Sequence, residues 1–105
     1  MLPLIKHGGA GCITAAANVA SSLAKVAFTS WRSDGGADAN DKLVAVRRAL
    51  VQHPLIAALK ELMARHTGDA TWTAMRPPNV RLSEAKRREL FRACDAIEFT
   101  LPAAA

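Results

Sequence analysis

The segment GGAGCITAAANVA, residues 8–20, constrains the fold of this chain most strongly. It predicts a glycine turn, one strand and the start of a helix. Cys12, Ile13 and Thr14 form a short apolar run that is typical of strands buried on both faces. The sequence predicts no second strand nearby. A lone buried strand requires neighbours, so we expect the chain to be part of a larger fold.

Composition limits the classes of protein that the chain can represent. Its 105 residues suit one domain, and a hydrophobic fraction of 50% argues against disorder. No apolar run is long enough to span a membrane, and the start MLPLIKHGG lacks the apolar core of a secretory signal. Cys12 and Cys94 share no metal or redox spacing, so both are interpreted as small buried apolar groups. We therefore expect a cytoplasmic location and no membrane partner.

Helix-end signals divide the rest of the chain. Residues 2–7 resemble the last turn of a helix that ends in glycines. Asn18 is a candidate N-cap for the next helix, and Ser83 is one for the last helix, with Glu84 in its first turn. Residues 72–80 should be extended because they contain two prolines. The helices after the strand are expected at residues 18–32, from about residue 38 or 40 to 52, 54–67, and from residue 83 onward, with a frayed tail at 101–105.

Apolar spacing predicts the buried face of each helix. On the exposed side of the second of these helices, Lys42, Arg47 and Arg48 should face water. Glu61 and Arg65 are expected to form an i,i+4 ion pair. The predicted buried residues are Val19, Leu23, Val26, Ala27 and Ser30 in the first helix, Leu43, Val46 and Leu50 in the second, Leu55, Ile56, Leu59, Leu62 and Met63 in the third, and Leu90, Phe91, Cys94 and Ile97 in the last.

Two segments together resemble the C-terminal third of the dihydrodipicolinate synthase and N-acetylneuraminate lyase family. Residues 8–20 are similar to the eighth barrel strand with its flanking loops, and PLIAALKELMARHTGDATWTAMRPPNVRLSE, residues 54–84, is similar to the helical extension. The resemblance implies a mainly α chain, the C-terminal piece of a (β/α)8 barrel with one short strand at most and about four helices. It divides a truncated domain, residues 1–105, into the last strand and helix at 1–33 and an extension at 37–105.

The same resemblance implies a class of reaction. Family members are pyruvate-dependent aldolases or lyases that form a Schiff base through a lysine on the sixth barrel strand, assisted by a tyrosine. The chain has no tyrosine. Its lysines all fall outside the positions that would match: Lys6, Lys25, Lys42, Lys60 and Lys86. We therefore expect an inactive isolated chain with no catalytic residue and no cofactor, and a 2-oxo acid substrate only in full-length relatives.

Thr14, Ala17 and Asn18 are the candidate site residues that the resemblance implies. They would lie at the mouth of a barrel and form part of the wall of the substrate pocket. A plainer interpretation remains open, in which Asn18 caps a helix and Thr14 supports the strand. The three histidines lie at different element ends without ligand spacing, so no metal site is expected.

A cluster of basic residues supports an alternative function. The formal net charge is +5, and a local excess of positive charge lies in residues 81–92. The chain would then be a small basic helical interaction module that self-associates or binds an acidic partner such as nucleic acid. Interleaved acids make nucleic acid the less favoured partner, and uncovered apolar faces favour a homo-oligomer. The residues of this basic patch are Arg81, Lys86, Arg87, Arg88 and Arg92.

Overall fold

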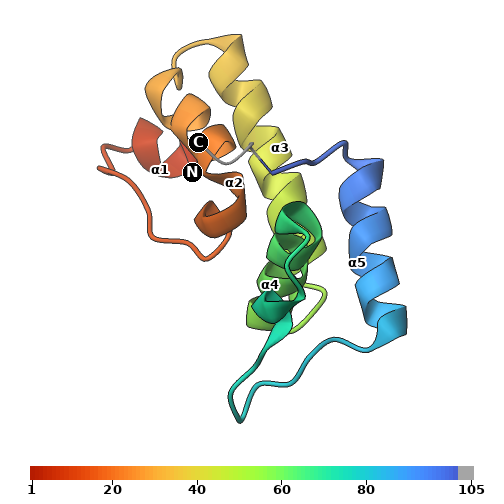
Figure 1. The fold of residues 1–105 in the computed structure, drawn as a ribbon. Coiled ribbons are helices and arrows are strands. Elements are labelled where there is room, and N and C mark those ends of the chain that lie inside the picture. The colour runs from red at the N-terminus through yellow and green to blue at the C-terminus, as the bar shows by residue number, and fades with distance from the viewer. Residues whose placement is uncertain (102–105) are drawn as a thin grey trace.

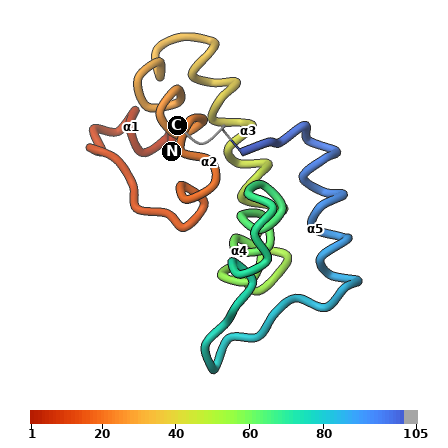
Figure 2. The backbone as a smooth tube through the Cα atoms, in the orientation of Figure 1, coloured from red at the N-terminus to blue at the C-terminus, as the bar shows by residue number. Residues whose placement is uncertain are grey.

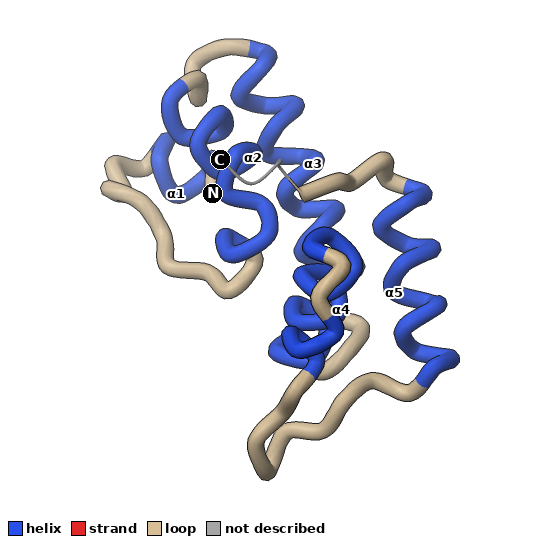
Figure 3. Tube along the Cα trace, in the orientation of Figure 1, coloured by secondary structure: helices blue, strands red, loops and turns tan. Residues whose placement is uncertain are grey.

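Helices form all the regular structure in residues 1–101, the part of the chain that the computed structural model describes (Figure 1). Figure 3 shows helices joined by loops and no strand in this part. The prediction of a mainly helical chain is confirmed. The elements are α1 (Leu2–Lys6), α2 (Ala17–Thr29), α3 (Asp34–Leu50), α4 (Leu55–Thr67), the 3-10 helix η1 (Ala70–Thr73) and α5 (Glu84–Ala96).

The core lies where α3, α4 and α5 meet the start of α2. Figure 2 shows α4 and α5 beside the C-terminal half of α3, while α1 and α2 gather near its N-terminal half. Most of the predicted apolar faces are confirmed, since burial of these side chains supplies the main driving force for packing. The buried cluster comprises Ala16, Val19, Ala20, Leu43, Val46, Leu50, Ala58, Leu59, Leu62, Leu90, Cys94 and Phe99.

Several predicted helix ends are confirmed. Gly8 adopts a φ of 85° just after α1, a left-handed conformation that glycine allows without steric cost. Pro54 precedes α4, and Ser83 Oγ accepts a hydrogen bond of 3.3 Å from the Lys86 amide at the start of α5. Glu84 lies in the first turn of α5, where a carboxylate stabilises the positive end of the helix. Local end signals therefore predict where α1 ends and where α4 and α5 begin.

The connection between α2 and α3 differs from the prediction. α2 ends at Thr29 and not near residue 32, and α3 already begins at Asp34, with Ser33 as its N-cap residue. Gly35 and Gly36, which precede the predicted start of this helix at residue 38 or 40, lie in the first turn of α3. A Cβ on Gly36 would lie 2.0 Å from the Ser30 carbonyl oxygen, so the absence of a side chain lets the two helices connect closely.

The strand predicted at residues 12–14 is not formed in residues 1–101, which agrees with the expectation of one short strand at most. Cys12, Ile13 and Thr14 form no regular structure, and Ile13 is fully exposed. Cys12 is exposed as well, whereas the prediction of a buried Cys94 is confirmed. A strand needs a neighbour to accept its backbone hydrogen bonds, and none is present in residues 1–101. The segment therefore remains a loop between α1 and α2.

Three further expectations need correction. Trp72 lies in η1, while residues 74–80 form neither helix nor strand, as expected. Ile56 is 54% exposed and Val26 is 43% exposed, so they lie outside the buried faces of α4 and α2. Leu101 packs against the core, with Phe99 buried just before it, so the described chain remains ordered beyond α5. The rest of the predicted frayed tail, residues 102–105, lies outside the described residues.

Candidate functional site

The three residues predicted for a pocket wall lie close in the chain, with the Ala17 amide 3.1 Å from the Thr14 carbonyl oxygen, but they do not line one pocket. Thr14 lines one pocket of about 250 Å³ on the α1–α2 loop, together with Leu43 and Arg47 of α3. Asn18 lines a different pocket of about 370 Å³ between α2, α4 and η1. Ala17 lines neither of these two pockets. Thr14 and Asn18 therefore line separate pockets in the described chain, and the pocket-wall role of the three residues in a full barrel stays a prediction.

Local hydrogen bonds explain the positions of Thr14 and Asn18. Thr14 Oγ1 accepts a bond of 3.4 Å from the Ala16 amide, and Asn18 Nδ2 donates one of 3.0 Å to the Ala15 carbonyl oxygen. The N-cap position of α2 is Ala16, so the prediction that Asn18 caps this helix is wrong. Ala20 is non-helical, with φ −123° and ψ 31°, so the first turn of α2 is kinked from the rest. These side chains stabilise a turn.

The pocket beside Asn18 is mostly apolar. It is lined by Ala15, Ile56, Leu59, Met63, Trp72 and the half-buried Lys60. Lys60 Nζ donates a bond of 2.5 Å to the Ala74 carbonyl oxygen and thereby ties α4 to the loop after η1. The lysine amine in this pocket is therefore already engaged in a structural contact.

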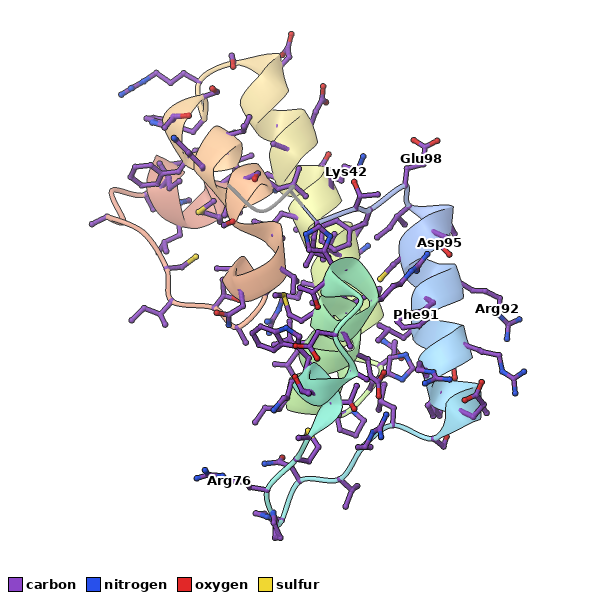
Figure 4. All side chains as sticks on the ribbon, viewed as in Figure 1. Lys42, Arg76, Phe91, Arg92, Asp95 and Glu98 are labelled. Carbon is purple, nitrogen blue, oxygen red and sulfur yellow. The ribbon has the colours of Figure 1, made fainter. Side chains whose placement is uncertain are left out.

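Ion pairs neutralise most of the basic patch. Lys86 Nζ lies 2.9 Å from Glu89, Arg88 lies 3.8 Å from Glu84, and Arg87 also pairs with Glu84. Figure 4 shows Arg92 extending from α5 on the side away from the other helices. These neighbouring carboxylates lower the positive potential of the patch.

Arg81 lies apart from the rest of the patch because it faces Glu61 of α4. Glu61 is 4% exposed, and its Oε1 lies 3.9 Å from Arg81 Nη2. The predicted pairing of Glu61 with Arg65 is wrong. Arg65 instead lies 2.8 Å from Asp95 of α5 and 4.8 Å from the centre of the Phe91 ring. Sequence spacing did not predict the contacts of Glu61 with Arg81 and of Arg65 with Asp95, because each contact joins segments that lie far apart in the sequence.

Three ionisable groups have shifted pKa values. The hydrogen bond from Lys86 lowers the pKa of Glu89, and the hydrogen bonds from Thr71 lower that of Asp69. Burial raises the pKa of the Cys94 thiol, so this thiol stays protonated and is a poor nucleophile. None of these shifts produces a reactive group.

Neither a cluster of metal-ligating side chains nor a membrane-spanning helix is present in the described residues. Residues 1–101 contain no group of three or more histidine, cysteine and acidic side chains that could hold a metal ion. No helix in this part of the chain combines the length and the apolar character needed to cross a bilayer.

Comparison with known proteins gives one match. The family model described as the Dihydrodipicolinate synthetase family matches residues 1–97. Neither the curated proteins nor the solved structures give a match. The family model covers nearly all of the 105 residues and agrees with the resemblance noted in two separate segments. The chain therefore belongs to the Dihydrodipicolinate synthetase family.

Proposed function

We propose that the chain is the C-terminal segment of a Schiff-base aldolase or lyase. Full-length relatives of this type would join or cleave a carbon–carbon bond with pyruvate or another 2-oxo acid. The observation that carries the proposal is the family match over residues 1–97. In this view the helices after residue 37 are the extension that follows a barrel.

The isolated chain is proposed to be catalytically silent. A Schiff-base lysine must present an unprotonated amine, which enzymes obtain by desolvating the side chain or by placing another cation beside it. Lys60 is half-buried, and its amine donates to the Ala74 carbonyl oxygen. The other four lysines are exposed, and Lys86 is paired with Glu89. These environments support the absence of a pyruvate-binding amine.

Reductive trapping tests this proposal. The purified chain is incubated with pyruvate and borohydride, and its mass is then measured beside that of an active family aldolase. We expect an adduct on the aldolase and none on this chain. A stable adduct on any lysine would contradict catalytic silence. Lys60→Arg is a matched variant, because it keeps the positive charge and shows whether such an adduct forms in the apolar pocket.

A second proposal concerns self-association. Ile13 is 106% exposed, Val80 is 71% exposed and Ile56 is 54% exposed, and large exposed apolar groups favour association. We propose that the chain forms a homo-oligomer through such surfaces. Light scattering over a range of concentrations tests this, and a sharp monomer at high concentration would contradict it. Salt-sensitive binding to DNA would instead support the basic-module alternative.

A further inference from the structure

Glu61 is a buried carboxylate without a hydrogen-bonded partner in the described chain. Its side chain is 5% exposed, and none of the hydrogen bonds formed by residues 1–101 involves its oxygens. The contact of 3.9 Å with Arg81 exceeds hydrogen-bond length. Among the described residues, the buried side-chain atom that lacks any partner is His53 Nδ1, so the Glu61 oxygens keep some contact with water and can accept a further donor.

The carboxylate lines a pocket that can hold such a donor. The pocket has a volume of about 250 Å³ and is also lined by Thr73, Arg65, Arg81, Arg87 and Phe91. This is below the range of about 300–1,000 Å³ for pockets that bind drug-sized ligands, so the space suits a smaller molecule.

The charges around the pocket restrict the chemistry of that molecule. Arg65 and Arg87 are already paired with Asp95 and Glu84, neither of which lines the pocket. Arg81 has only Glu61 as an ion-pair partner among the described residues. A simple anion would be repelled by Glu61, whereas a simple cation would be repelled by the arginines. A molecule that carries both charges satisfies both sides.

We propose that this pocket binds a small zwitterion of the amino-acid type. Its ammonium group would donate to Glu61, and its carboxylate would accept from Arg81. Because Glu61 and Arg81 already lie 3.9 Å apart, the four charges would alternate around a closed ring in which each has two opposite neighbours. The site shares none of the three pocket-wall candidates, so it is independent of the proposed aldolase relationship.

Titration followed by amide resonances tests the proposal with three probes. Glycine carries both charges, acetate carries only the negative charge and methylammonium carries only the positive charge. We expect a saturable shift near Glu61 and Arg81 with glycine, at roughly millimolar concentration for so small a ligand. Each single-charge probe should bind at least about tenfold more weakly, since it loses one charged hydrogen bond.

Three variants decide whether these two residues form the site. Glu61→Gln and Arg81→Gln keep similar shapes and should each weaken glycine binding at least about tenfold. Arg88→Gln removes an exposed arginine outside the pocket and should leave binding unchanged. If Glu61→Gln fails to fold, Arg81→Gln still tests the site, because the Arg81 side chain is 56% exposed. No saturable shift with glycine, or equal binding by Arg81→Gln, would overturn the proposal.

Discussion

Gly35 and Gly36 occupy neighbouring positions at the start of α3, yet alanine should act differently at each. At Gly35 a Cβ would have Ser33 Oγ as its nearest neighbour, at 3.9 Å. At Gly36 it would lie 2.0 Å from the Ser30 carbonyl oxygen and 2.5 Å from the carbonyl carbon. These are backbone atoms, so no side-chain rotation can relieve the clash. The turn between α2 and α3 would have to open.

The expected difference in stability can be worked out from these distances. Alanine restricts the unfolded chain and so adds about 0.4–1 kcal/mol at a compatible glycine. Both variants gain this contribution, so their difference isolates the overpacking cost, about 1–3 kcal/mol. Gly35→Ala should therefore raise the free energy of unfolding. The free energy of unfolding of Gly36→Ala should lie about 1–3 kcal/mol below that of Gly35→Ala.

Urea denaturation followed by circular dichroism measures both variants beside the unchanged chain. A difference of 1 kcal/mol corresponds to about 4–8 °C in melting temperature for a domain of about this size, which gives a second readout. The denaturant slopes should agree, so that the midpoints can be compared directly. Equal stability of the two variants, or a more stable Gly36→Ala, would refute the close approach of α3 to Ser30.

The remaining predictions concern the core and the two cysteines. Leu90→Ala should lower the free energy of unfolding by about 2–5 kcal/mol, because Leu90 is fully buried. Ile13→Ala should change it by less than about 0.5 kcal/mol, and equal effects in the same urea assay would argue against packing of α5. Iodoacetamide should modify exposed Cys12 well before Cys94, as peptide masses would show, and equal rates in the folded chain would contradict this. Because burial raises the pKa of Cys94 above 9.0, stability should decline as pH rises past that ordinary value, and Cys94→Ala should weaken the decline.

Much of the helical framework could be predicted because its signals are local and periodic. Leu43, Val46 and Leu50 recur at helical spacing, and all three are buried on α3. Ser83 precedes its helix with a hydroxyl that can reach an amide three residues later. Signals of this kind need no knowledge of the rest of the fold.

The errors arise where distant packing overrides a local preference. Glycine disfavours helix, yet Gly36 lies in one because only hydrogen fits beside Ser30. Phe99 lies beyond the last periodic residues, and its amide donates a bond of 2.9 Å to the Cys94 carbonyl oxygen as the chain turns back. Its burial depends on that reversal, which helical periodicity does not encode.

The candidate site was even less predictable from spacing. Glu61 and Arg65 have the ideal separation for a helical ion pair, but such pairs contribute only tenths of a kcal/mol, about 0.2–0.5. Packing of α5 against α4 places Asp95 within 2.8 Å of Arg65, and the loop before α5 places Arg81 near Glu61. A weak local preference therefore gave way to partners that only the tertiary structure supplies.

The loop around Ile13 links the fold to the proposed origin of the chain. Its residues have the apolar, β-branched character of a buried strand, but a strand gains stability only from backbone partners and from cover on its faces. Residues 1–101 offer neither, so Ile13 stays in water although full burial of such a side chain is worth about 1.5–3 kcal/mol. A segment of a larger barrel would carry such a pattern, suited to a sheet although residues 1–101 form no strand. The same unburied side chain makes this loop a natural point of contact in the homo-oligomer that we propose.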